Sequence, residues 1–140
     1  MKFLLDTCVI SEIIRPRPAG KVLKWFERGE ESTFFLSVLT FGELHKGIEK
    51  LPESNKRATL NDWVENDLKE RFRNRIIDID LKVAESWGKL LARAETVGRR
   101  MPAIDSLIAA TGIAHRLTVV TRNIADMKES GVALLNPWEG

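Results

Sequence analysis

Short apolar segments alternate with longer amphipathic segments along the whole chain of 140 residues. The short segments are rich in β-branched and aromatic residues, as strands are, and the longer ones repeat apolar residues at helical spacing. The expected strands are residues 2–5, 33–38, 75–79, 117–121 and 132–135, and the expected helices are residues 11–14, 20–29, 40–50, 54–72, 81–97, 102–114 and 123–128. Alternating strands and helices favour βαβ units, so the sequence predicts an α/β fold with a mostly parallel central sheet.

Composition narrows the class of protein further. The length suits one ordinary domain, expected to span residues 1–140, and 44% apolar residues provide for a sizeable core. With a net charge of +2, the chain lacks the strongly basic charge that is typical of nucleic-acid-binding proteins. Its single cysteine, Cys8, can form neither an internal disulfide nor a zinc cluster. No apolar stretch approaches ~20 residues, so we expect a cytoplasmic protein without a membrane span.

Acidic residues follow the expected strands. Asp6 comes directly after the first strand, Glu43 lies near the start of the helix that follows the second, and Asn123 and Asp126 follow the strand at residues 117–121. Ligands of parallel sheets bind outside the carboxyl ends of the strands, so these side chains are expected at one edge of the sheet. Asp105 lies in the first turn of the helix at residues 102–114, whose position the pattern leaves open.

Each acid also has a simpler interpretation. Asp6 is a common type of turn residue after a strand. Residues 40–43, Thr-Phe-Gly-Glu, match the S/T-x-x-E capping box, in which Glu43 would bond back to the start of its helix. That interpretation and a functional one are compatible, because a capping box also places the acid near the strand-to-helix edge.

The remaining three residues have equally ordinary alternatives. Asp105 suits the positive end of a helix dipole, although its neighbours in AIDSLIAA are apolar or small. A charge in such surroundings is costly unless it is paired or bound to a metal. Asp126 and Asn123 are also compatible with a solvated loop acid and a helix cap.

Taken together, the acids indicate a metal site. Several carboxylates at one edge repel one another, and hard divalent cations with a preference for oxygen ligands relieve that repulsion. Mg²⁺ or Mn²⁺ fits this set of ligands, whereas zinc prefers His and Cys clusters. Such ions activate water and stabilise charge on a reacting phosphate, so hydrolysis of a phosphodiester is the expected chemistry.

Four stretches carry a family resemblance across the chain: LLDTCVISE, LSVLTFGELHKGI, AIDSLIAATGIAHRLTVVTRNIADM and LLNPWEG. They resemble PIN-domain ribonucleases, and more narrowly the VapC toxins of bacterial toxin–antitoxin pairs, including the FitB-like subgroup. The resemblance implies a three-layer, Rossmann-like α/β domain. It also implies that Asp6, Glu43 and Asp105 are the acidic metal-site positions.

Further positions follow from the same resemblance. Asn123 and Asp126 match positions that complete the site directly or through water, and Thr121 matches a small hydroxyl residue beside it. Cys8 departs from the family, which usually has Asn after the Asp-Thr pair. As a residue type, Cys8 is expected to be a small buried hydrophobe rather than a reactive thiol.

The implied activity is that of a Mg²⁺-dependent endoribonuclease in which metal-activated water cuts RNA, leaving a 3′-hydroxyl and a 5′-phosphate. The implied partners are a cognate antitoxin, promoter DNA only through the antitoxin complex, and a second copy of the chain in a homodimer. Two alternatives stay open. One is a catalytically weak PIN module that only binds nucleic acid or antitoxin, and the other is a Mg²⁺-binding signalling receiver domain.

Basic residues near the acids are candidates for holding RNA. Arg122 and Arg15 are the nucleic-acid-binding candidates, and a wider basic rim would also include Arg17, Lys21, Arg99 and Arg100. Arg122 is favoured because Asn123 follows it directly. The alternative for these cations is ordinary solvated surface charge.

Overall fold

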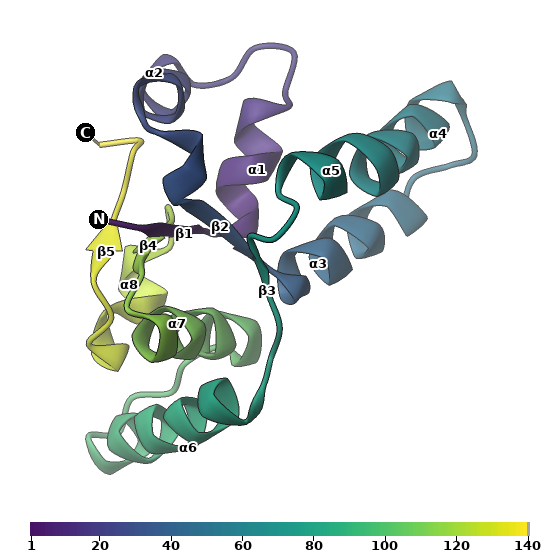
Figure 1. Ribbon diagram of the computed structural model, residues 1–140. Coiled ribbons are helices and arrows are strands. Elements are labelled where there is room, and N and C mark those ends of the chain that lie inside the picture. Colours follow the sequence, from purple (N-terminus) through teal and green to yellow (C-terminus); the bar gives the residue numbers. More distant parts are fainter. Residues whose placement is uncertain (140) are drawn as a thin grey trace.

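The computed structural model describes residues 1–139 and contains a five-stranded sheet in the order β3-β2-β1-β4-β5 (Figure 1). The strands are β1 (Phe3–Leu5), β2 (Phe34–Ser37), β3 (Ile76–Ile77), β4 (Thr118–Val120) and β5 (Leu134–Leu135). Every neighbouring pair in this sheet is parallel, as predicted. Gly140, which ends the LLNPWEG stretch and the expected domain, lies outside the described residues.

Helices connect and flank the strands. They are α1 (Thr7–Ile13), α2 (Gly20–Arg28), α3 (Val38–Glu49), α4 (Asn55–Asp62), α5 (Lys69–Arg71), α6 (Leu81–Thr96), α7 (Ala103–His115) and α8 (Ile124–Met127). A π-helical segment, η2 (Trp63–Leu68), joins α4 to α5, and short 3₁₀ turns, η1 (Glu31–Thr33) and η3 (Lys128–Ser130), precede β2 and follow α8. No helix within residues 1–139 combines the length and apolarity that crossing a membrane requires.

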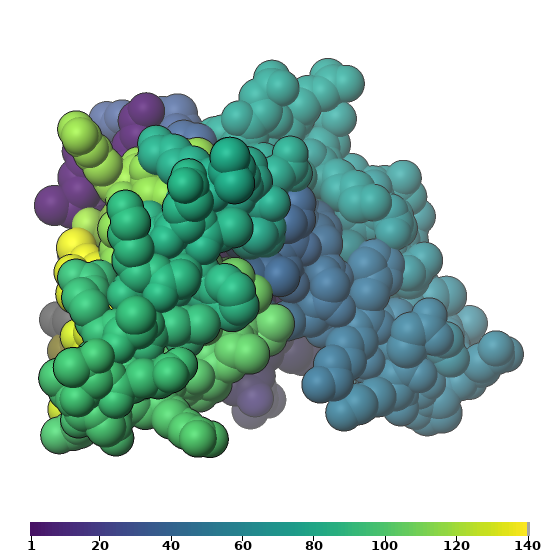
Figure 2. Space-filling model, turned by 90° about the horizontal axis from the view of Figure 1, so that it is seen from below, coloured from purple at the N-terminus to yellow at the C-terminus, as the bar shows by residue number. Residues whose placement is uncertain are grey.

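Two apolar cores lie on opposite faces of the sheet. Successive side chains of a strand point to opposite faces, so Leu4 packs with residues of α6 and α7 while Leu5 packs with residues of α1 and α2. Figure 1 shows these helix pairs on either side of the strands, and Figure 2 shows α6 covering one face with α3 and α4 to its side. The predicted three-layer α/β architecture is therefore confirmed.

Two helix starts differ from the sequence-based expectation. A short turn was expected at residues 11–14, but α1 begins at Thr7, because the Asp6 side chain accepts the Thr7 backbone N–H. The prediction of a capping box at residues 40–43 is also wrong. Helix α3 begins at Val38, and its N-cap is Ser37, whose side chain accepts the Leu39 backbone N–H.

The region between α3 and α6 differs in detail. The helix expected at residues 54–72 is present, but its middle is the π-helical segment η2. The strand expected at residues 75–79 is shorter, since only Ile76 and Ile77 pair with β2.

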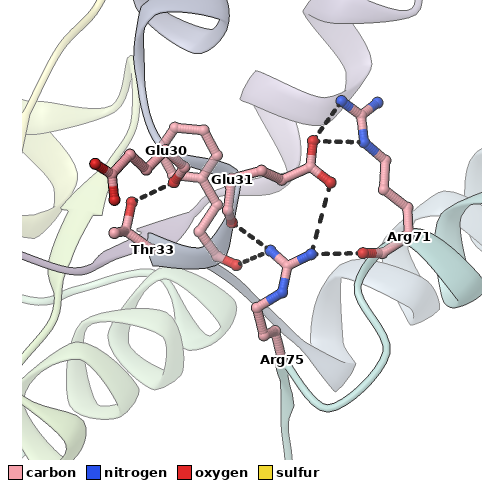
Figure 3. Close-up of polar contacts among 6 residues, drawn as sticks. Glu30, Glu31, Thr33, Arg71 and Arg75 are labelled. Carbon is pink, nitrogen blue, oxygen red and sulfur yellow. Dashed lines mark hydrogen bonds and ion pairs between the residues drawn. The ribbon is translucent and has the colours of Figure 1, made fainter.

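Arg75 fixes the chain just before β3. Its guanidinium donates to the backbone oxygens of Glu31 (2.5 Å), Phe34 (2.7 Å) and Arg71 (2.5 Å), as Figure 3 shows for the residues around it. These bonds tie the turn before β2 to the end of α5.

Close packing places α7 against the sheet. A Cβ atom at Gly112 would lie 2.8 Å from side-chain atoms of both Val119 and Val132, a distance that real Cβ atoms essentially never show. Glycine therefore lets this part of α7 approach β4 and the segment before β5. The same helix carries Asp105 in its first turn.

Candidate active site

Asp6 stands where β1 ends and α1 begins, with only 4% of its surface exposed. One carboxylate oxygen, Oδ1, accepts the Thr7 backbone N–H at 2.9 Å, and the other, Oδ2, accepts the Thr121 hydroxyl at 2.8 Å. Thr121 directly follows β4, the neighbour of β1 in the sheet. Two adjacent strand ends therefore hold this acid in one orientation.

Thr7 links Asp6 to Glu43, because its backbone N–H bonds Asp6 and its hydroxyl bonds Glu43. The Thr7 hydroxyl donates to Glu43 Oε1 at 2.6 Å and lies 3.0 Å from the Thr40 hydroxyl. A hydroxyl has one hydrogen, so when Thr7 donates to Glu43 it accepts from Thr40. Sequence analysis did not single out Thr7, although its place directly after Asp6 was a usable signal.

Asp105 joins this group from α7. Burial, and then the negative charges of Asp6, Asp126 and Glu43 in that order of effect, together raise the pKa of its carboxyl to about 6. The structure thus brings the four predicted acids into one electrostatic neighbourhood and settles the position of Asp105. Within residues 1–139, however, no three His, Cys, Asp or Glu side chains converge tightly enough to form a preassembled metal-ligand group.

Cys8 lies beside Asp6 on the same turn. Its Sγ is 3.7 Å from Asp6 Oδ2 and 3.7 Å from Thr121 Oγ1. Burial, and then the charge of Asp6, raise the pKa of the Cys8 thiol to about 11, so the thiol is neutral near pH 7. Burial also raises the pKa of Asp6, against the opposing effect of its hydrogen bonds. A neutral, half-buried thiol agrees with the structural interpretation of Cys8.

Asn123 and Asp126 lie at the exposed side of the group. The Asn123 backbone N–H donates to the Thr121 hydroxyl at 2.9 Å, which places Asn123 next to the residue that holds Asp6. The Asn123 side chain makes no capping bond to α8, and both Asn123 and Asp126 are exposed. Both side chains are therefore accessible to a ligand at this edge.

The donor set fits a hard divalent cation. It consists of carboxylate oxygens and the amide oxygen of Asn123, the ligand types that Mg²⁺ and Mn²⁺ prefer. Burial is the main cause of the raised pKa of Asp105, and the added effect of three carboxylates indicates negative charge that the described protein leaves unneutralised. A bound cation would relieve that repulsion.

The two predicted nucleic-acid contacts differ in their surroundings. Arg122, between Thr121 and Asn123, is exposed, and its guanidinium carbon lies 5.3 Å from the centre of the Trp138 ring. Arg15 is 65% exposed and pairs with Glu12 at 3.4 Å. The Arg122 guanidinium thus packs against the Trp138 ring, a contact that sequence analysis did not predict.

A family model for the PIN domain matches residues 3–129. The chain belongs to the PIN-domain family. This membership confirms the resemblance drawn from the four sequence stretches and sets aside the receiver domain.

Curated PIN relatives match nearly the whole chain. VapC ribonuclease Y4jK of Sinorhizobium fredii is 33% identical over 97% of this chain and 97% of that protein. Toxin FitB of Neisseria gonorrhoeae is 36% identical over 96% of this chain and 97% of that protein. A solved structure of FitAB bound to an IR36 DNA fragment has a TM-score of 0.92 at 34% identity, covering 97% of this chain and 95% of that chain.

Proposed function

We propose that this PIN domain is a divalent-metal-dependent endoribonuclease and the toxin of a toxin–antitoxin pair. The observation that carries the proposal is the group of acids at the strand ends. Thr121 holds Asp6, Thr7 holds Glu43, and burial and three neighbouring carboxylates raise the pKa of Asp105. Such an accumulation of charge is typical of a functional site. The names of two full-length relatives, a VapC ribonuclease and the toxin FitB, support RNA as the substrate and toxicity as the role. Such a toxin would act in the cytoplasm.

Three acids would hold the ion, with one further residue completing its ligands. Asp6, Glu43 and Asp105 are the proposed ligands of Mg²⁺ or Mn²⁺, and Asn123 or Asp126 binds it directly or through water. A divalent cation held there supplies the charge that lowers the pKa of a water molecule and stabilises a phosphate during its transfer.

Neighbouring hydroxyls prepare the acids for this task. Thr7 engages Glu43 Oε1 and leaves Oε2 free for a ligand. The Thr7 backbone N–H occupies one lone pair of Asp6 Oδ1, which keeps a second, whereas Oδ2 accepts both the Thr121 hydroxyl and the Cys8 thiol. Arg122, whose guanidinium lies over the Trp138 ring, would contact a phosphate of the RNA near Asn123.

The proposed partners follow from the relatives. An antitoxin would bind the chain and block it, and the complex would contact promoter DNA through the antitoxin. The likeness to the chain in FitAB bound to a DNA fragment supports this assembly. The homodimer expected from the sequence stays a prediction that sedimentation would test.

Incubation of antitoxin-free protein with total RNA tests the enzymatic part of the proposal. We expect discrete cuts in Mg²⁺, no cuts in EDTA, and a loss of at least 100-fold in rate in Asp6→Ala and in Asp105→Ala. Glu85→Ala, which removes an exposed acid on α6, is the matched control and should cut like the wild type. Cuts that persist unchanged in both aspartate variants would contradict the proposal.

The alternative, a catalytically weak PIN module that only binds nucleic acid or antitoxin, has one observation in its favour. Cys8 replaces the amide that the family usually has beside the first acid, and its thiol is neutral. RNA binding by a folded wild type that cuts nothing at any divalent ion would favour that alternative.

A further inference from the structure

A second surface lies between α2 and the segment that follows β5. A cavity of about 470 Å³ opens there, and its walls include residues of α2, the first residues of β1 and β2, and Leu135, Asn136 and Pro137. In Figure 1 the chain after β5 runs toward α2 on this side of the sheet. The acids of the candidate active site do not contribute to this cavity.

Aromatic rings form part of its wall. The Trp25 ring lies edge-on to Phe3, with 5.3 Å between the ring centres, and is stacked on Phe34 at 5.2 Å. Phe34 is buried, whereas Trp25 and Phe3 are partly exposed. Because the buried Phe34 ring is stacked on one face of the Trp25 ring, Trp25 can offer a rigid flat surface to a ligand in the cavity.

Three cations line the same cavity. Lys21, Lys24 and Arg28 have the spacing of neighbours on one side of a helix, and all three are exposed. Within residues 1–139 none of them forms an ion pair, and no carboxylate lines the cavity. The surface therefore presents three positive charges that the described part of the chain leaves uncompensated.

The cavity is connected to the candidate active site through the chain itself. Pro137 lines it, and the next residue, Trp138, carries the Arg122 guanidinium beside Asn123. On the sheet, Phe3 of the cavity and Asp6 of the site are separated by β1, about 10 Å at ~3.3 Å per residue. Arg122, through Trp138, is thus close in the chain to a wall of the cavity.

We infer that this cavity binds a single-stranded segment of the RNA whose scissile phosphate lies at the acids. A base stacks on Trp25, and backbone phosphates contact Lys21, Lys24 and Arg28. Sites for single-stranded nucleic acid combine an aromatic platform with a basic groove in this way. An acidic peptide would use the cations but would leave the aromatic platform without a role. The inference rests on the proposed ribonuclease function.

Binding of a labelled single-stranded RNA by fluorescence anisotropy tests the inference, with Asp105→Asn in every protein to keep the RNA intact. Lys21→Gln/Lys24→Gln/Arg28→Gln should bind at least tenfold more weakly. The slope of log K against log salt should become shallower by about 2, since each single-strand phosphate contact contributes ~0.7. The control Lys56→Gln/Lys82→Gln/Lys89→Gln removes three exposed cations without ion pairs among residues 1–139 and should bind within twofold of the parent.

A second variant tests stacking. Trp25→Leu should weaken RNA binding about tenfold, and an abasic RNA should bind this variant and the parent equally. Circular dichroism verifies that each variant is folded. Unchanged affinity and salt slope in the α2 triple variant would overturn the inference, as would duplex DNA competing as well as the single strand. If the α2 triple variant lost binding to an acidic peptide but kept its binding to RNA, the surface would be assigned to a protein partner instead.

The two proposals fail in distinguishable ways. Aspartate-dependent RNA cutting together with unchanged binding by the α2 triple variant would leave the ribonuclease standing and remove the α2 site. RNA binding that depends on α2, in a protein that cuts no RNA, would uphold the α2 site and contradict the ribonuclease.

Discussion

Asp105 shows how a functional residue costs stability. Burial and the charges of three other acids raise the pKa of its carboxyl in the folded protein to about 6, above its ordinary value near 4. The protonated carboxyl therefore favours the folded state. This contribution is complete below the unfolded-state pKa and is lost as the pH rises through about 6. Near neutral pH the ionised Asp105 works against folding until a cation compensates it.

We therefore expect Asp105→Asn to stabilise the metal-free protein while abolishing cleavage. The full pKa shift corresponds to about 3 kcal/mol, but the side chain is only half-buried and solvent screens it. We expect a gain in the free energy of unfolding on the order of 1 kcal/mol at pH 7.5 in EDTA.

Urea denaturation at several pH values measures this gain, which should vanish near pH 4 because the wild-type carboxyl is then protonated. Mg²⁺ should raise the melting temperature of the wild type and leave that of the variant nearly unchanged. An Asp105→Asn protein that is less stable than the wild type at pH 7.5 in EDTA would contradict this account of the charge cluster.

At the scale of single elements, local sequence patterns predicted where the helices lie more accurately than the residues at which they begin. The stretch LSVLTFGE offers two hydroxyl caps, Ser37 and Thr40, and the capping-box pattern favoured Thr40. The structure uses Ser37, because the sheet register pairs Ser37 with Ile77 and ends β2 there. That register is a long-range property which the local pattern does not contain. As a consequence Glu43 lies in the second turn of α3, free of capping and within reach of Thr7.

The junction of β2, α5 and β3 depends on Arg75 more than on the acid beside it. The Arg75 side chain is 17% exposed and donates to three backbone oxygens (Figure 3), whereas Glu31 is 41% exposed. Arg75→Lys should lower the free energy of unfolding by about 2 kcal/mol, since an ammonium group does not reproduce the planar fork. Glu31→Gln, the control, should cost less than about 1 kcal/mol. Equal losses in the two variants would show that the ion pair, rather than the backbone bonds, holds this junction.

At the scale of the whole molecule, alternation and strand ends predicted the parallel sheet and the edge at which Asp6, Glu43 and Asn123 meet. The position of Asp105 lay beyond that reasoning, because it depends on how α7 packs against α6 and the sheet, including the close approach at Gly112. The bridge from Thr7 to Glu43 and the contact between Arg122 and Trp138 join residues far apart in the chain. Periodicity and turn signals describe single elements and carry no information on such pairs.

The central claim is that these acids serve phosphodiester hydrolysis by water. Its most direct measurement is the chemistry of the RNA ends produced in Mg²⁺ and ¹⁸O-labelled water, read by mass spectrometry. The account predicts 3′-hydroxyl ends and 5′-phosphates that carry one ¹⁸O atom, because water is the nucleophile. Ends with a 2′,3′-cyclic phosphate and a 5′-hydroxyl would contradict it, since the RNA's own 2′-hydroxyl would then have attacked the phosphorus.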